Sequence, residues 1–376
     1  MKKFTGAGIA LLLGTTAAYA GGMDRSGQSI TALFEEGTYA EISFGSVSPD
    51  VTGVSAIAYG GTASGNVAPN YTQMGFAYKT DVNENFSFAL IVDNPFGAMV
   101  EYNTAGYLLN GTAADVPTRG YTLLGQYHLN ENVSIYGGPR LITASGEYTR
   151  VFSGTTVYHA EYSSDTDVGY VVGAAYEIPE IALRAALTYS SATEFELDGT
   201  GTDIGGAMTT TLNAAMPQSV NLDLQSGIAE NTLAFVNVRW ADWSEAHLTD
   251  SNANSTITPT GLPAPNAFVN PDRGVLSDFT DSDVTTFTVG IGRKLSDNFA
   301  GQIALGYEKS TGIEASNLAP TDGYKSISIG GAYTFDNGME LSGGVRYVDL
   351  GDATTSIASF TDNSVTAIGL KLAYNY

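Results

Sequence analysis

The sequence predicts an all-β protein: a transmembrane, antiparallel, up-and-down β-barrel of about 14 strands with a short N-terminal hatch segment. Two observations predict this fold. From residue 81 onward the turns alternate between short and long, and the segments between the turns alternate large apolar residues with small or polar ones. A closed barrel in an outer membrane produces both patterns, because its turns are tight on the periplasmic side and its wall separates lipid from a sheltered lumen.

The short turns lie at regular intervals along the chain. They are expected at 81–85, 129–132, 178–180, 229–231, 295–298 and 335–338. Long outer loops are expected between them, at 48–70, 103–118, 198–216, 246–279, 311–321 and 350–362. Only the connection near 150–157 is short on the outer side.

The segments flanking these turns are expected to be the strands. They cover roughly 38–47, 71–80, 86–102, 119–129, 133–149, 158–177, 181–197, 217–227, 231–245, 280–294, 299–310, 322–335, 339–349 and 363–376. The last of them shows the alternation: Ile368 and Leu370 fall on one face, whereas Ala367, Gly369 and Lys371 fall on the other. An even number of strands returns the C-terminus to the side of the short turns.

The bulk composition suits a barrel and excludes one class of partner. Only 15% of the 376 residues are charged, yet the formal charge is −23, and the chain has 44 Gly and no Cys. A strongly acidic chain argues against binding of nucleic acid, whose phosphates need Lys and Arg. No stretch has the composition of a linker between domains.

The N-terminus has the pattern of a secretory signal. Lys2 and Lys3 precede a short apolar run, and Ala18-Tyr19-Ala20 matches a cleavage site. The expected organisation is a signal peptide at 1–20 cleaved near Ala20, a short plug or hatch at 21–37, and the barrel at 38–376. Sec-type export then leads to the outer membrane of a Gram-negative bacterium.

Aromatic residues near strand ends are expected to form girdles at the two membrane interfaces, where amphipathic rings are enriched. Any one of them is alternatively a residue that stacks on a ligand. The candidates are Tyr121, Tyr136, Tyr189, Trp240, Trp243, Tyr333 and Tyr347.

The third strand contains a break at Asn94, Pro95, Phe96 and Gly97. Pro95 donates no ladder hydrogen bond, and Gly97 adds no packing side chain. An unpaired carbonyl in hydrocarbon is unfavourable, so the wall is expected to bend away from its neighbour here. The alternative is that Asn94-Pro95 ends the strand in an ordinary turn at the outer interface.

Several arginines fall on the lumen face if the alternation is continued along their strands. Arg140, Arg239 and Arg346, with Arg150 as a further candidate, are possible partners for a carboxylate, which a guanidinium holds by two parallel hydrogen bonds. The alternative is that they pair with lumen acids such as Glu308 and Glu340. Leu233 and Phe235, on the Arg239 face, are candidates for contact with an apolar ligand tail.

Catalysis is not expected. The three histidines, His128, His159 and His247, are scattered, and only His159 with Ser163 has a conceivable spacing. No catalytic residue, metal ligand or cofactor is predicted, because no metal-spaced His or Cys cluster and no phosphate-binding loop is found.

Several local patterns, in this order, resemble the FadL/TodX-type outer-membrane transporters of long-chain fatty acids and other hydrophobic compounds. They are Ala32-Leu33-Phe34 followed by Tyr39-Ala40-Glu41 and Ser43-Phe44-Gly45, Asp93-Asn94-Pro95-Phe96-Gly97, Leu187-Thr188-Tyr189-Ser190, Met216-Pro217-Gln218-Ser219 and Trp240-Ala241-Asp242-Trp243-Ser244. The family hatch is usually longer and contains an Asn-Pro-Ala motif that is absent here.

This resemblance implies a monomeric, passive transporter embedded in outer-membrane lipid and lipopolysaccharide. A hydrophobic small molecule such as a long-chain fatty acid is taken into a lumen pocket and leaves through a lateral opening at strand 3. Two alternatives stay open: a general diffusion porin for small solutes, and a surface-structural or adhesive barrel.

Overall fold

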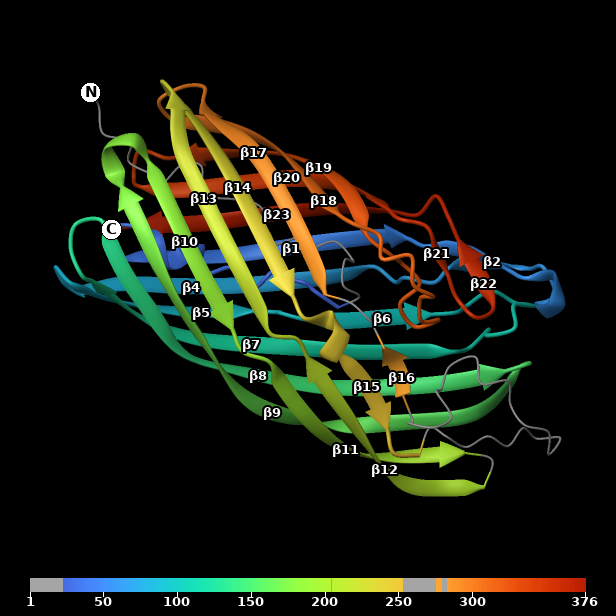
Figure 1. Ribbon diagram of the computed structural model, residues 1–376. Coiled ribbons are helices and arrows are strands. Elements are labelled where there is room, and N and C mark those ends of the chain that lie inside the picture. The colour runs from blue at the N-terminus through green and yellow to red at the C-terminus, as the bar shows by residue number, and fades with distance from the viewer. Residues whose placement is uncertain (1–22, 204, 253–274, 279–282) are drawn as a thin grey trace.

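The computed structural model describes residues 23–203, 205–252, 275–278 and 283–376, which form a closed antiparallel barrel of 14 strands (Figure 1). The predicted signal peptide with its cleavage site near Ala20, and most of the predicted loop 246–279, lie outside the described residues.

Nine of the 14 barrel strands are continuous, and five are interrupted and appear as two elements each. The continuous strands are β1 (Tyr39–Asp50), β4 (Tyr71–Asn83), β7 (Ala113–His128), β8 (Val133–Phe152), β9 (Thr155–Ile178), β18 (Phe299–Glu308), β19 (Tyr324–Thr334), β20 (Met339–Leu350) and β23 (Ser364–Asn375). The interrupted ones are β5 (Phe86–Asp93) with β6 (Gly97–Glu101), β10 (Leu183–Ser190) with β11 (Thr193–Asp203), β12 (Gly206–Met216) with β13 (Ser219–Ala229), β14 (Thr232–Ala241) with β15 (His247–Asp250), and β16 (Val275–Asp278) with β17 (Val284–Lys294).

The first and last strands close the barrel. β1 pairs with β23 from Tyr39↔Asn375 to Asp50↔Ser364, so the sheet has no lateral edge at this seam. The C-terminus lies at the end opposite to β2 (Thr52–Ser55), β21 (Ala353–Thr354) and β22 (Ala358–Phe360), as expected for an even number of strands (Figure 1). With β3 (Ala63–Asn66), these three short strands form a second sheet beyond the barrel wall.

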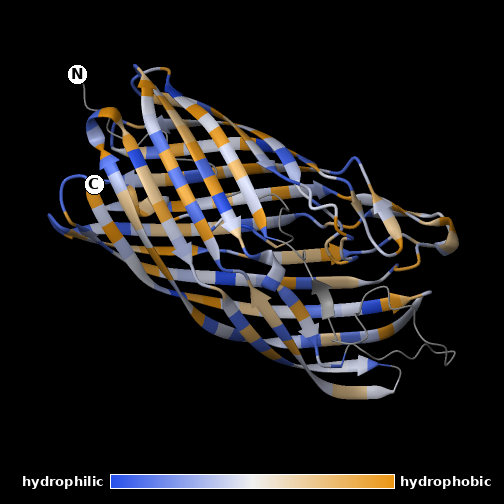
Figure 2. Cartoon of the chain, viewed as in Figure 1, coloured by the Kyte–Doolittle hydropathy of each residue, from blue (hydrophilic) through white to orange (hydrophobic). Residues whose placement is uncertain are grey.

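The predicted alternation is confirmed along the wall. On β23, Ile368 and Leu370 are 52% and 53% exposed on the outside, whereas Ala367 and Ala373 are buried inside. Hydrophobic and hydrophilic residues alternate along most strands in Figure 2. The apolar outer face is what a wall in contact with hydrocarbon requires.

The predicted long loop at 198–216 is wrong, because the structure has a strand hairpin there. β11 and β12 pair from Thr193↔Met216 to Asp203↔Gly206. Phe195 and Leu197 face inward, while Glu194 and Glu196 face outward. The outward positions are polar, as in a strand whose outer face meets water, and this polarity resembles that of a loop.

The girdle prediction is wrong for Tyr136 and Trp243, which are both buried in the lumen. Tyr136 shares the inward parity of Arg140, and Trp243 continues the parity of Arg239 and Ala241. By contrast, the predicted girdle residues Tyr121, Tyr333 and Tyr347 are exposed on the outer face.

Residues 23–38, called the hatch below, occupy the lumen. The hatch contains the short 3-10 helix η3 (Thr31–Phe34), and Ile30 and Leu33 pack against inward residues of strands around the barrel, such as Ala77, Leu124 and Val171. A second apolar cluster includes Met23 from the start of the described hatch. The other 3-10 helices are η4 (Ile57–Tyr59), η5 (Pro179–Ile181) and η6 (Trp243–Glu245). Within the described ranges, no helix has both the length and the apolar character to cross a bilayer.

Candidate functional site

The third barrel strand is interrupted at Asn94–Phe96, and this segment is called the wall break below. β5 pairs with β4 up to Phe76↔Val92, but the described pairing between these two barrel strands ends there. β6, beyond the break, pairs with β7 from Gly97↔Pro117 to Glu101↔Ala113. No described ladder therefore joins residues 71–75 of β4 to β6. Beyond this gap, the Glu101 N–H at the end of β6 donates a hydrogen bond to the Val67 carbonyl, just before β4 (2.8 Å).

The wall break is an interruption within one strand and not its end, since β7 holds both sides of it. Thr118 Oγ1 accepts a hydrogen bond from the Phe96 N–H (2.9 Å) and donates one to the Phe96 carbonyl (2.6 Å). Asn94 Nδ2 donates to the Thr118 carbonyl (2.8 Å). A Cβ at Gly120 would lie 2.6 Å from Asp93 Oδ1 and 3.2 Å from Pro95 Cδ, so the fold of the break needs glycine at this position.

The start of the hatch pairs with the wall break as a short antiparallel strand. Asp24 is the bridge partner of Phe96. The Arg25 N–H donates to the Pro95 carbonyl (3.0 Å), and the Gly97 N–H donates to the Met23 carbonyl (2.8 Å). The hatch thus satisfies backbone groups that a regular β4–β5 ladder would otherwise satisfy.

Arg25 spans the unpaired edge between β4 and β6. Its Nε donates to the Gly97 carbonyl on β6 (2.6 Å), and its guanidinium carbon lies 3.6 Å from the ring centroid of Tyr71 on β4. A Cβ at Gly97 would approach Arg25 Nε to 3.2 Å. One hatch side chain therefore contacts both strands that the ladder leaves apart.

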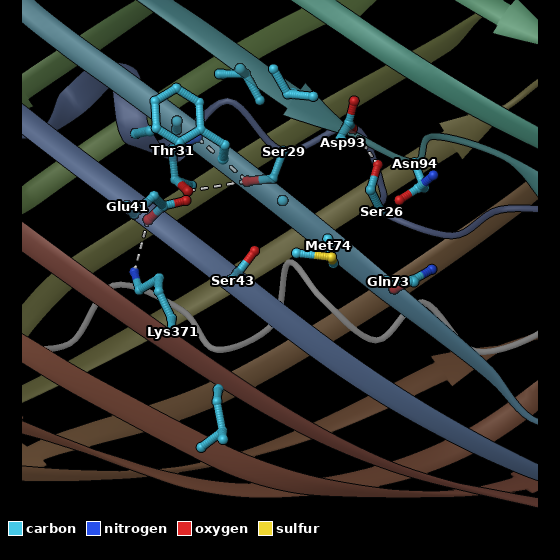
Figure 3. Close-up of a pocket in the computed structure, with 17 residues that line it drawn as sticks. Ser26, Ser29, Thr31, Glu41, Ser43, Gln73, Met74, Asp93, Asn94 and Lys371 are labelled. Atoms are coloured by element: carbon cyan, nitrogen blue, oxygen red, sulfur yellow. Dashed lines mark hydrogen bonds and ion pairs between the residues drawn. The ribbon is translucent and has the colours of Figure 1, made fainter.

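A cavity of about 90 Å³ lies beside the wall break (Figure 3). Hatch residues Ser26, Ser29 and Thr31 line it together with residues of β4 and β5, among them Met74, Ile91 and Asp93. Ser26 Oγ donates to Asp93 Oδ2 (2.5 Å), which ties the hatch to the last residue of β5. The lining combines hydroxyl and apolar groups, and the volume is enough for several waters or one small ligand group.

The predicted lumen arginines are all buried, and the structure brings two of them to the hatch. Arg239 Nε lies 2.5 Å from Asp24 Oδ2, and its other nitrogens donate to Asn221 and Gln28. Arg140 donates to Thr122 Oγ1 (2.7 Å) and Ser190 Oγ (3.1 Å) and lies within electrostatic reach of Asp93 and Asp24.

The other predicted site residues lie elsewhere. Arg346 donates to Ser326 Oγ (3.0 Å) and stacks on Tyr324, whereas Arg150 is buried in the outer part of β8. Leu233 and Phe235 are buried on the inner face of β14, but they line neither the cavity nor the two apolar clusters.

Sequence reasoning missed the residues that complete the break: Asp24 and Arg25 of the hatch, Tyr71 of β4, and Thr118 and Gly120 of β7. The pair Asp24-Arg25, two opposite charges in an otherwise small and polar segment, was the available signal for the hatch. Thr118 had none, because threonine is common in strands. Within the described ranges, no group of three or more His, Cys, Asp or Glu residues could hold a metal ion.

Comparison with known proteins extends over nearly the whole chain. A family model described as outer membrane protein transport protein (OMPP1/FadL/TodX) matches residues 23–374. A search of curated protein sequences finds no match.

Three solved structures are similar in fold. A Pseudomonas aeruginosa FadL homologue has a TM-score of 0.76 at 13% identity, with 96% of this chain and 97% of that chain covered. The P. putida toluene transporter TodX has a TM-score of 0.66 at 13% identity, with 91% and 90% covered. The Ralstonia pickettii toluene transporter TbuX has a TM-score of 0.65 at 12% identity, with 96% and 98% covered.

Proposed function

Because this chain belongs to the OMPP1/FadL/TodX family of outer-membrane transport proteins, we propose that it takes up hydrophobic small molecules passively and releases them sideways through the wall break. The observation that carries the proposal is the missing ladder between β4 and β6, which the hatch covers from inside. A wall held closed by a separate segment opens when that segment moves, without breaking a continuous sheet.

The proposed ligand is a hydrophobic molecule such as a long-chain fatty acid. The apolar and aromatic residues of the outer lumen suit a tail or ring, and buried guanidinium groups suit a carboxylate. We propose Arg140 and Arg239 as the carboxylate partners nearest to the wall break, with Arg346 and Arg150 as further candidates along the lumen. TodX and TbuX are toluene transporters, so a neutral aromatic molecule is the competing ligand class.

The lipid-facing surface of the barrel is apolar at the position where the ligand would be released. Met74 and Phe76 on β4 and Leu370 on β23 are exposed there and also belong to the lining of the cavity at the break. A hydrophobic molecule that leaves at this position passes from the lumen to hydrocarbon without crossing the aqueous periplasm.

The test is to repair the strand. Replacing Asn94-Pro95 with Val-Thr restores a ladder donor at residue 95 and should abolish uptake of a labelled fatty acid into proteoliposomes. The matched control is Pro139→Thr, because Pro139 lies within β8, a continuous barrel strand, and should leave uptake unchanged. Undiminished uptake by the repaired strand would count against lateral release.

Single-channel conductance separates this function from a diffusion porin. The closed hatch predicts no steady ionic current across a planar bilayer. A large, steady conductance would instead favour a pore for small polar solutes.

A further inference from the structure

We propose that the Asp24 carboxylate is a built-in substitute for the carboxylate of the ligand. A hydrophobic carboxylic acid that reaches the lumen replaces Asp24 on Arg239, and this replacement detaches the hatch from the wall break. The inference rests on the proposed function and names its substrate class as hydrophobic carboxylates.

Arg239 already holds a carboxylate. Its Nε donates to Asp24 Oδ2 (2.5 Å), a charge-assisted hydrogen bond, and both side chains are largely buried, at 7% and 11% exposed. The barrel wall positions the guanidinium, since its Nη1 donates to Asn221 Oδ1 (3.0 Å). An acid from outside the chain would meet the same Nε–H donor as Asp24 does.

The same wall residues hold the hatch around Asp24. Asn221 Nδ2 donates to the Gly27 carbonyl (2.9 Å), and Ser219 Oγ donates to Gln28 Oε1 (2.7 Å). Gln28 Oε1 also accepts from Arg239 Nη2 (3.3 Å). Residues 24–28 are therefore fixed at one wall of the lumen by the site that recognises the carboxylate.

Asp24 connects this site to the wall break through its own backbone. Its side chain binds Arg239 on β14, while its backbone is paired with Phe96. The next residue, Arg25, contacts both unpaired strand edges through Gly97 and Tyr71. Loss of the Asp24–Arg239 contact therefore removes one of the anchors that hold Arg25 across the gap.

Exchange of one carboxylate for another keeps the charge of Arg239 compensated. A neutral ligand cannot do this, because displacing Asp24 without replacing it leaves a buried guanidinium without its counter-ion, which is strongly unfavourable. The ligand's charge thus selects which molecules open the wall, whereas the ligand's apolar part supplies affinity.

The experiment compares hexadecanoic acid with its neutral methyl ester on the full-length protein in detergent, by amide hydrogen exchange. The acid should accelerate exchange of the Arg25 and Gly97 amides by at least about tenfold, within the usual range of coupling between two binding events, and the ester should not. In Asp24→Asn these amides should exchange quickly without ligand and respond to neither probe.

Two variants control for folding. Asp24→Glu keeps the carboxylate and should restore slow exchange and the response to the acid. Asp198→Asn alters a carboxylate on the β11–β12 hairpin, which accepts a hydrogen bond from Thr211 Oγ1 (3.2 Å), and should behave as the wild type.

Three results would each overturn the inference, even when uptake through the break is intact. They are slow exchange of the Arg25 and Gly97 amides at saturating acid, equal acceleration of their exchange by the ester, and wild-type protection of these amides in Asp24→Asn. If the wild type binds neither probe, the proposed uptake of fatty acids is contradicted together with this inference.

Discussion

The ring of Phe96 at the wall break meets the ring of Trp243 edge to face, with the centroids 6.1 Å apart. Phe96 lies in the third barrel strand, and Trp243 lies in the interruption of the ninth, between β14 and β15. Two interruptions in distant strands thus meet inside the lumen, where both rings belong to the same apolar cluster as Met23 of the hatch.

Phe96→Ala should leave Trp243 in a looser, wetter environment. The chain has only two tryptophans, so in a Trp240→Phe background the fluorescence reports Trp243 alone. We expect a red-shifted emission and a loss of about 3–5 kcal/mol in unfolding free energy, the usual effect of truncating a buried Phe. An unchanged spectrum would mean that the two rings do not pack in solution.

Gly120→Ala should destabilise the barrel at the wall break. The new Cβ would meet Asp93 Oδ1 at 2.6 Å and the Pro95 ring at 3.2 Å, and such overpacking typically lowers stability by about 1–3 kcal/mol. Gly301→Ala is the matched control, because its nearest atom would lie at 3.4 Å. Thermal unfolding in detergent compares the two variants, and equal melting temperatures would argue against close packing of Pro95 on β7.

The docking of the hatch should weaken as the pH rises. Burial raises the pKa of Glu35 from 4.5 to about 7; Lys371 and Arg184 oppose the shift, and the carboxylates of Glu41 and Glu340 add to it. The docked hatch therefore binds this proton more tightly than the undocked one, so the stabilisation present below pH 4.5 is lost as the pH rises to about 7.

Hydrogen exchange of the η3 amides between pH 4.5 and 8 checks this expectation after correction for intrinsic rates. Protection should decline with pH in the wild type, whereas Glu35→Gln should flatten the profile across this range. A decline of equal size in the Gln variant would assign the pH dependence to another group.

The sequence was sufficient for the parts of the fold that repeat. Strand positions and the alternation of Ile368 and Leu370 with Ala367 and Gly369 follow from the contact of one wall with lipid and lumen. The inward direction of Arg140 and Arg239 follows in the same way, since each shares a face with buried neighbours.

Sequence patterns could not predict the contacts across the lumen. Asp24 and Arg239 are 215 residues apart, and nothing local in either segment specifies the other. The β11–β12 hairpin was missed for a different reason: strands whose outer face meets water carry polar residues such as Glu194 and Glu196, so their composition resembles that of loops.

The most direct test of the account is to lock the hatch to the wall break. Asp24 and Phe96 are direct bridge partners, at a separation that suits a disulfide, and the chain has no other cysteine. The variant Asp24→Cys with Phe96→Cys, with each single substitution as control, is compared in proteoliposomes before and after reduction. We expect no uptake of a labelled fatty acid in the oxidised form and recovery on reduction; equal uptake in both forms would contradict release through the wall break.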